Sequence, residues 1–318
     1  MATCFRPRIK ILGKNKDLAF YILKVKDYAW QNLNDYLVEP SSSLAKAMFL
    51  ATRREIPDEL RNIFAKVGLS HMIAISGLHM AIIVWLMQSF LIALGLSRKS
   101  SLWFLIIFLA IYLYMIGFPS SAVRASWMVI ILLLGPFLGR STESIYSLVL
   151  VADIFILFNP YLLLYDIGFQ LSFLAVAGLL YYVKFFNKAL VFIPTKFKIR
   201  EVMAVTLAAQ VFTWPFIIYN FGIFSLIAPI ANFLILPFLP AVLILSIILG
   251  IFGAWSFIAN IIAWPLFIIL KIIVQIAELL AKVPYAFVII EDFSLFYMFL
   301  ALFFMLMITL VLKPKDYE

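Results

Sequence analysis

The feature that most constrains this chain is a polar interruption at the start of a long apolar run, in the segment His71-Met-Ile-Ala-Ile-Ser-Gly-Leu-His79. It places two histidines, Ser76 and Gly77 where a helix would enter a membrane. In hydrocarbon an unpaired backbone amide costs several kcal/mol, so such a break is stable only where other helices cover it or where it borders a water-filled path. We therefore expect a pore or transport site here rather than a simple anchor.

The composition requires a membrane protein. Hydrophobic residues make up 65% of the chain and charged residues 13%, against roughly 45–50% and 25% in soluble domains. The apolar runs are long and continuous, whereas a β-barrel shows short alternating segments. The sequence therefore predicts an all-α, polytopic transmembrane helix bundle. The single Cys4 excludes a disulfide within the chain and a multi-cysteine metal centre.

We expect about 8–10 membrane segments, some of them broken or partial. The predicted spans cover residues 72–96, 102–118, 122–139, 145–158, 166–183, 201–219, 256–283 and 286–312. The stretch 145–158 is short for the roughly 20 residues that a spanning helix needs. Pro229, Pro237 and Pro240 interrupt the run between Ile223 and Trp255. This run is either a broken helix of the kind found where substrates pass through transporters, or a merely kinked helix.

The chain divides at about residue 70. Residues 1–70 contain no run long enough to span a membrane, which predicts a surface segment that is extracytoplasmic or interfacial. Within it, Leu18 to Val38 mixes aromatic and charged residues, as an interfacial amphipathic helix does. Residues 71–318 form the predicted transmembrane channel domain.

The basic loops predict the orientation of a multi-pass inner-membrane protein. Lys and Arg gather in the loops at 98–99, at 140 and at 184–200, and the positive-inside rule places such loops in the cytoplasm. Residues 1–70 then lie outside the cytoplasm. Because nothing visible in them would carry them across, we expect either an additional upstream span or an unusual insertion of the first span.

Four segments, in order along the chain, resemble motifs of the ComEC family. His71–His79 is similar to the family's HLLAISGLHV-type signature, and Pro119–Ala125 to its Pro-Ser…Arg-Ala element. Asn159-Pro160 followed by Asp166–Phe173 is similar to the NP…GFQLSF element. The segments Ala208–Gln210, Trp214-Pro215, Tyr219–Gly222, Pro229–Phe233 and Pro237 are similar to the block that follows it. The resemblance extends from about Leu44 to about Leu245.

This resemblance implies an inner-membrane channel that passes single-stranded DNA into the cytoplasm during natural transformation. It also implies partners: single-stranded DNA, membrane lipid, a cytoplasmic helicase and a periplasmic DNA-binding protein. Proteins of this family often add an oligonucleotide-binding-fold domain and a metallo-β-lactamase-like domain. The chain resembles the channel domain alone.

The candidate site combines polar residues of the predicted spans with the matched motifs. Arg124 is expected to contact a DNA phosphate, because a guanidinium pairs bidentately with phosphate oxygens; the alternatives are an interfacial anchor or a partner of Asp166. Ser76 and His79 either bond a passing strand or satisfy backbone groups freed at a helix break. Interhelical hydrogen bonds are the alternative for the polar amides. The predicted channel residues are Ser76, Gly77, His79, Arg124, Gln170, Gln210 and Asn232.

No enzymatic activity, cofactor or metal is expected. The chain has neither a G-x-x-x-x-G-K-[ST] phosphate loop nor an H-E-x-x-H motif. His71 and His79 are its only histidines, which disfavours a zinc hydrolase. The main alternative function is a secondary transporter for a small anionic solute, in which Asp153 or His79 would couple proton movement. A membrane scaffold without cargo is a third possibility.

Overall fold

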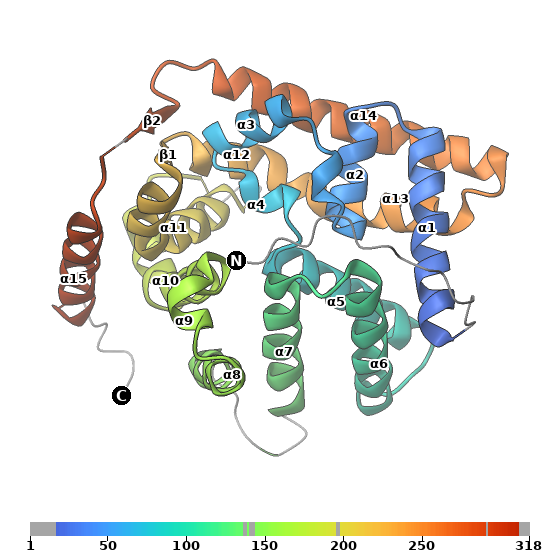
Figure 1. The fold of residues 1–318 in the computed structure, drawn as a ribbon, viewed down its shortest axis with the longest axis horizontal. Coiled ribbons are helices and arrows are strands. Elements are labelled where there is room, and N and C mark those ends of the chain that lie inside the picture. Colours follow the sequence, from blue (N-terminus) through green and yellow to red (C-terminus); the bar gives the residue numbers. More distant parts are fainter. Residues whose placement is uncertain (1–16, 136–138, 140–143, 195–197, 291, 312–318) are drawn as a thin grey trace, which may run out of the picture.

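The computed structural model describes residues 17–135, 139, 144–194, 198–290 and 292–311 (Figure 1). Within them the chain is an α-helical bundle with one small two-stranded sheet, which confirms the predicted all-α class. The first elements in chain order are α1 (Leu18–Tyr36), α2 (Ser41–Leu50), η1 (Arg53–Glu55), α3 (Asp58–Lys66), α4 (Ser70–Ile73), α5 (Gly77–Ala93), α6 (Arg98–Ile116), α7 (Ser120–Leu134), α8 (Ser144–Phe158), α9 (Leu162–Tyr165) and α10 (Ile167–Ala189). The remaining elements are α11 (Ile199–Phe221), β1 (Ile223–Ser225), α12 (Ala228–Ile235), η4 (Leu236–Phe238), α13 (Leu239–Phe252), α14 (Ser256–Ala281), β2 (Phe287–Ile289) and α15 (Leu295–Val311).

Several helices meet the requirements of a membrane span. Judged by length and composition, five in the described residues are long and apolar enough to cross: α6, α10, α11, the run from α12 to α13, and α14. Four shorter apolar helices accompany them: Gly77–Ala93, Ser120–Leu134, Ile145–Phe158 and Leu295–Thr309. Within the described residues the segment at 145–158 is one of these shorter helices, and residues 140–143 directly before it lie outside the described part of the chain. The protein is therefore a polytopic membrane protein with both long and partial apolar helices.

The proline-rich run is interrupted as predicted. Pro229 lies in the first turn of α12, Pro237 lies in η4 and Pro240 lies in the first turn of α13. A proline lacks the amide that an α-helix uses for its hydrogen bonds, so each is tolerated best where a helix begins. The chain consequently forms two α-helices joined by a 3₁₀ turn.

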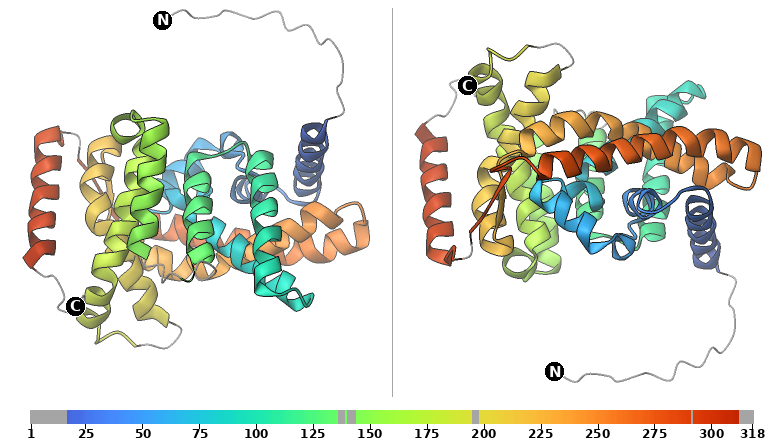
Figure 2. Two further views of the ribbon diagram at one scale, coloured as in Figure 1. Left: turned by 90° about the horizontal axis from the view of Figure 1, so that it is seen from below. Right: turned by 90° about the horizontal axis from the view of Figure 1, so that it is seen from above.

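The predicted helix over 286–312 is wrong at its beginning. Phe287–Ile289 form β2, which pairs antiparallel with β1 in the register Ile223 with Ile289 and Ser225 with Phe287. The helix α15 begins only at Leu295 and stands at one edge of the molecule, beside α11 (Figures 1 and 2). A short apolar run alone does not distinguish strand from helix, and here a distant partner strand decides.

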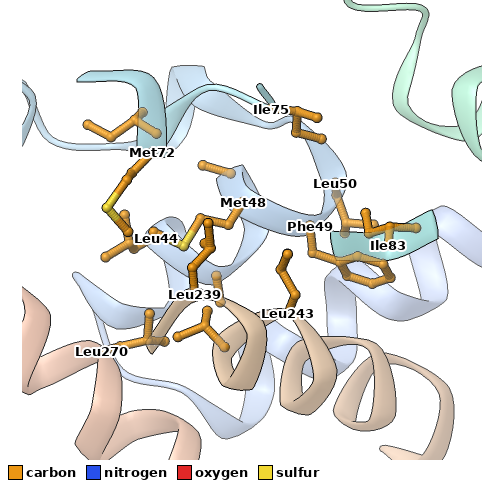
Figure 3. Close-up of a cluster of buried hydrophobic side chains, with 14 of the residues drawn as sticks. Leu44, Met48, Phe49, Leu50, Met72, Ile75, Ile83, Leu239, Leu243 and Leu270 are labelled. Atoms are coloured by element: carbon orange, nitrogen blue, oxygen red, sulfur yellow. The ribbon is translucent and has the colours of Figure 1, made fainter. Parts of the chain in front are cut away.

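The predicted surface location of residues 1–70 is wrong for α2. Every residue of α2 is buried, and Leu44 and Met48 pack in the main hydrophobic core against Leu239 and Leu243 of α13 (Figure 3). The reason is visible in the local sequence, because Ser41–Leu50 carries only one charged side chain, while the rest of the segment is rich in charge. The amphipathic helix α1 packs against this centre through Ala29 and Leu33.

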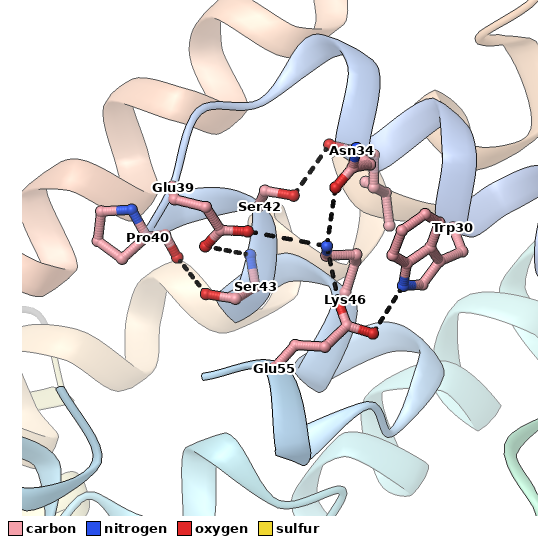
Figure 4. Close-up of polar contacts among 9 residues, drawn as sticks. Trp30, Asn34, Glu39, Pro40, Ser42, Ser43, Lys46 and Glu55 are labelled. Atoms are coloured by element: carbon pink, nitrogen blue, oxygen red, sulfur yellow. Dashed lines mark hydrogen bonds and ion pairs between the residues drawn. The ribbon is translucent and has the colours of Figure 1, made fainter. Parts of the chain in front are cut away.

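The one charge of α2, Lys46, is buried inside a polar cage (Figure 4). Its ammonium lies 2.7 Å from a carboxylate oxygen of Glu55, 3.1 Å from Asn34 Oδ1 and 3.8 Å from Glu39. The ring of Trp30 covers it at 4.4 Å and donates its indole N–H to Glu55. A buried ammonium is stable only with such partners. The cage therefore fixes α1, α2 and η1 to one another.

The helices α10 and α11 pack closely along their length. Gly178 of α10 is buried against the backbone of α11, where a Cβ atom would overlap the carbonyl oxygen of Ala208. Small residues of this kind allow the backbones of membrane helices to approach each other.

We predict that Gly178→Ala destabilises the protein. Helix propensity alone would make alanine about 1 kcal/mol more favourable, but overlap with a backbone atom costs roughly 1–3 kcal/mol because the helices must separate. The measurement is the thermal unfolding midpoint in detergent. Gly77→Ala is the matched control, since its Cβ would lie 3.8 Å from Ala125 Cβ, an ordinary contact. A higher midpoint for Gly178→Ala would contradict the packing argument.

Candidate functional site

Three of the matched motifs meet where the helices α5, α7 and α10 begin. The hydroxyl of Ser121 in α7 donates to the carbonyl oxygen of Ile75, just before α5, at 2.6 Å. The guanidinium of Arg124 in α7 donates through Nη2 to the carbonyl oxygen of Gly168 in α10 at 2.7 Å. Since α6 returns the chain between α5 and α7, these two helices begin on the same side. The tertiary structure thus gathers residues that lie about 90 positions apart in the sequence.

Arg124 is the central residue of this junction. Its side chain is 1% exposed, and its Nη1 lies 3.9 Å from Asp166 Oδ2. Its guanidinium also lies 5.7 Å from the ring centre of Phe169. Among the residues that the structure describes, Arg124 Nε has no hydrogen-bond partner. Arg124 therefore joins α7 to α10, and its buried Nε–H group stays without a partner within the described residues.

Asp166 and Gly168 surround the guanidinium of Arg124 at the start of α10. Asp166 is the N-cap residue of α10, and its Oδ1 accepts a hydrogen bond from the amide of Phe169 at 2.9 Å. A Cβ at Gly168 would lie 3.1 Å from Asp166 Oδ1 and 3.6 Å from Arg124 Nη2, so the glycine leaves room for both side chains. Asp166 therefore caps α10 and is also the counter-charge of Arg124, which is one of the alternatives predicted for that arginine.

His79 and Ser76 form a second polar contact where α5 begins. His79 Nδ1 lies 3.0 Å from Ser76 Oγ and accepts a hydrogen bond from the amide of Ser76 at 3.4 Å. Because Nδ1 accepts, the proton of the neutral ring is on Nε2. This Nε2 is buried and lacks a partner in the described part of the chain. The imidazole therefore accepts from the backbone amide of Ser76 at the start of α5. Satisfying such a backbone group is one of the two roles predicted for Ser76 and His79.

The other predicted residues take no part in the described contacts that join α5, α7 and α10. Gln170 donates from Nε2 to the carbonyl oxygens of Leu163 and Leu164 at 2.7 and 3.3 Å, so it caps the end of α9. Gln210 is half-buried in α11. Asn232 is buried in α12, and its Oδ1 has no partner among the described residues. Neither belongs to the contacts that join α5, α7 and α10.

The electrostatics of the junction favour an anion. Each helix N-terminus carries a partial positive charge of roughly half an elementary charge, and the exposed amides of such termini bind phosphates and carboxylates. Three termini and a guanidinium meet here, opposed by the carboxylate of Asp166. The described residues contain no group of three or more His, Cys, Asp or Glu side chains suited to a metal ion.

The sequence contained a usable signal for Asp166 but none for Ser121. An aspartate directly before an apolar helical run is a recognised N-cap pattern, and that pattern identifies Asp166 as the start of α10. Ser121 resembles any serine near a helix end. Its bond to Ile75 depends on how α5 and α7 pack, which local sequence does not specify.

We predict that Asp166→Asn destabilises the protein although it preserves the N-cap. Asparagine caps helices about as well as aspartate, but the variant leaves the guanidinium of Arg124 buried without a counter-charge. Breaking a buried pair costs roughly 3–5 kcal/mol, and the 26% exposure of Asp166 places the expected loss at about 3 kcal/mol or less. The thermal unfolding midpoint in detergent measures it.

Asp153→Asn is the matched control for this test. Asp153 is an exposed residue of α8, so its neutralisation should leave the unfolding midpoint unchanged or raise it. Equal midpoints for Asp166→Asn and the unmodified protein would show that the ion pair contributes nothing to stability.

The chain is similar to proteins of known family. A family model described as "Competence protein" matches residues 48–315. The curated protein "ComE operon protein 3" of Bacillus subtilis (strain 168) is 28% identical over 230 residues, which cover 72% of this chain. The matched region spans 29% of the length of that relative. No solved structure matches the chain.

Proposed function

The chain belongs to the competence protein family, and we propose that it forms an inner-membrane channel through which single-stranded DNA enters the cytoplasm during natural transformation. The polytopic helical architecture supports a membrane path. The family match covers residues 48–315, which include all the apolar helices from α5 to α15.

The single observation that carries this proposal is the junction of helix N-termini around Arg124. A phosphodiester strand presents one negative charge per nucleotide, and the electrostatic term dominates its affinity for proteins. Helix N-termini and a guanidinium offer it donors without requiring particular bases. This fits a channel that must accept any sequence.

In this proposal the ion pair between Arg124 and Asp166 is present when no DNA strand is bound at the junction. At 3.9 Å the ion pair is long, and Arg124 Nε is unused. A phosphate that replaced Asp166 would offer the guanidinium the bidentate geometry that it prefers. We therefore assign Arg124 as a phosphate contact and Asp166 as its partner when the strand is absent. Ser76, Gly77 and His79 would line the same entrance from α5.

We propose that other proteins supply the energy for DNA uptake and deliver the DNA to the membrane. The chain has no phosphate loop for ATP, so we propose that a cytoplasmic helicase pulls the strand and a periplasmic DNA-binding protein presents it. We assign the chain itself no enzymatic activity and no cofactor. Its remaining contacts are with membrane lipid.

We predict that Arg124→Ala lowers transformation at least tenfold and that Arg124→Lys restores it only in part. An ammonium keeps the charge but loses the planar fork. In the native host, transformation frequency is measured separately from DNA entry into the periplasm, together with membrane abundance. Arg98→Gln, which removes an exposed charge at the start of α6, is the matched control.

The outcomes separate the competing functions. Normal transformation by Arg124→Ala would overturn the phosphate contact, and a loss explained by missing protein would assign Arg124 a structural role only. Saturable, gradient-dependent uptake of a small anion into vesicles that contain the purified protein would favour the secondary transporter instead.

We also predict that the loop between α10 and α11 faces the cytoplasm and that residues before α4 do not. In a Cys4→Ser background, an impermeant thiol reagent should label Asn62→Cys in intact spheroplasts, because this position is exposed in α3. Lys188→Cys, exposed at the end of α10, should react only after permeabilisation. The reverse pattern would invert the topology.

A further inference from the structure

Two pairs of exposed aromatic rings lie at the end of the bundle where α7 and α10 begin. Tyr114, near the end of α6, and Phe118, in the turn that leads to α7, have ring centres 6.0 Å apart. Tyr161 and Tyr165, at the two ends of α9 just before α10, have ring centres 6.1 Å apart. Tyr165 is 76% exposed and Phe118 is 55% exposed. Aromatic surface therefore precedes both helices that hold the Arg124 junction.

The contacts between α7 and α10 bring the two aromatic pairs to one end of the molecule. Ser120, two residues after Phe118, has its hydroxyl 3.9 Å from the position that a Cβ atom of Gly168 would take. Gly168 comes three residues after Tyr165, and its carbonyl oxygen accepts the hydrogen bond from Arg124 at 2.7 Å. Each pair therefore lies within a few residues of the contacts that hold the guanidinium.

The short helix α9 is held in place by side chains on both sides of it. Asn159 Oδ1 accepts a hydrogen bond from the amide of Tyr161 at 3.1 Å. Gln170 of α10 donates to two carbonyl oxygens of α9, at 2.7 and 3.3 Å. The amide of Tyr165 donates to the carbonyl oxygen of Tyr161 at 2.9 Å. The backbone that carries the two tyrosine rings is thus fixed to α10.

Phe118 is held in a backbone conformation that a phenylalanine rarely adopts. Its φ is 50°, in the left-handed region, where a bulky side chain is an outlier. The residue before a proline, here Pro119, also prefers extended backbone with negative φ. The amide of Phe118 donates to the carbonyl oxygen of Leu113 at 2.9 Å, which closes the turn. Strain of this kind gathers at functional sites, because the surrounding structure must enforce it.

The fixed position of these rings favours a nucleic acid over lipid as their partner. Exposed tyrosines also occur in the aromatic belts at membrane interfaces, but a ring that only inserts among lipid headgroups needs no fixed orientation. A ring on which a base stacks must be held beside the group that binds the backbone. Stacking also tolerates any sequence, because every base has a π-face.

We propose that Phe118, Tyr161 and Tyr165 form an aromatic platform on which bases of the incoming single strand stack while Arg124 contacts its phosphate. This inference rests on the proposed function and adds the bases to the recognised chemistry of the strand. Gln170 is then a positioning residue, since it holds α9 and its rings against α10.

The test measures binding of a fluorescent dT20 oligonucleotide to the full chain in nanodiscs of phosphatidylcholine. Tyr165→Ala should weaken binding at least about fivefold, the lower end of the range for one stacked base. Tyr165→Phe keeps the ring and should bind as the wild type does. Tyr165→Leu keeps an apolar side chain without a ring and should bind as weakly as Tyr165→Ala. Tyr146→Ala, which removes an exposed tyrosine of α8, is the matched control and should bind normally.

A second arm separates contacts to bases from contacts to phosphates. An abasic strand of the same length keeps the phosphates, and wild-type protein and Tyr165→Ala should bind it equally. With dT20, Tyr165→Ala should leave the slope of log K against log salt unchanged. Arg124→Gln should reduce this slope by about 0.7, the value for one phosphate contact to a single strand.

Three results would overturn the platform. These are normal binding of dT20 by Tyr165→Ala, an equal loss of affinity for the abasic strand, and recovery with Tyr165→Leu, which would assign the ring to lipid. Unchanged unfolding midpoints in detergent confirm that the variants are folded. If Tyr165→Ala lowers the midpoint, Tyr161→Ala provides the same comparison at the second exposed ring of α9.

Transformation frequency in the native host separates failure of the platform from failure of the proposed function. If Tyr165→Ala loses affinity for dT20 but transforms normally, the platform is supported and the channel proposal fails. If Tyr165→Ala binds dT20 normally while Arg124→Ala reduces transformation as predicted, the platform alone is overturned. If the wild-type protein does not bind dT20, both are overturned.

Discussion

The buried guanidinium of Arg124 is the contact on which the arrangement of the other motifs depends. A charged side chain within a membrane costs at least about 2.5–3.5 kcal/mol on insertion scales unless it is paired. Arg124 meets this requirement with the carbonyl oxygen of Gly168 and the carboxylate of Asp166. Because both partners belong to the first turn of α10, the pairing orients α10 relative to α7. The shared end of α5, α7 and α10 follows from it.

A second buried charge organises the N-terminal helices of the molecule. Lys46 connects α1, α2 and η1 through acceptors that come from α1, from η1 and from the loop before α2. This allows α2, which is apolar apart from Lys46 and its serines, to occupy the middle of the core.

The polar contacts near the proposed entrance are pairs within the chain. Asp166 pairs with Arg124, and Ser76 bonds one nitrogen of His79. Within the described residues, Arg124 Nε and His79 Nε2 have no partner. An entrance for a polyanion must attract charge without binding it permanently. An internal pair that a phosphate can replace meets both needs: Arg124 always has an anionic partner, and Asp166 remains partly exposed and hydrogen-bonded to the amide of Phe169.

The amino-acid sequence alone was sufficient for the class of protein, for most of its helices and for the motifs of its family. Continuous apolar runs, prolines and capping residues act over a few neighbouring positions, so α6, α10, α11 and α14 can be recognised locally. For the junction around Arg124, the sequence provided the separate residues and, as one alternative, the pairing of Arg124 with Asp166. The geometry of the junction, the burial of α2 and the pairing of β1 with β2 were decided by tertiary structure. Each of these joins segments distant in sequence, and the free energy that selects them comes from burial and pairing across the bundle, which no local pattern contains.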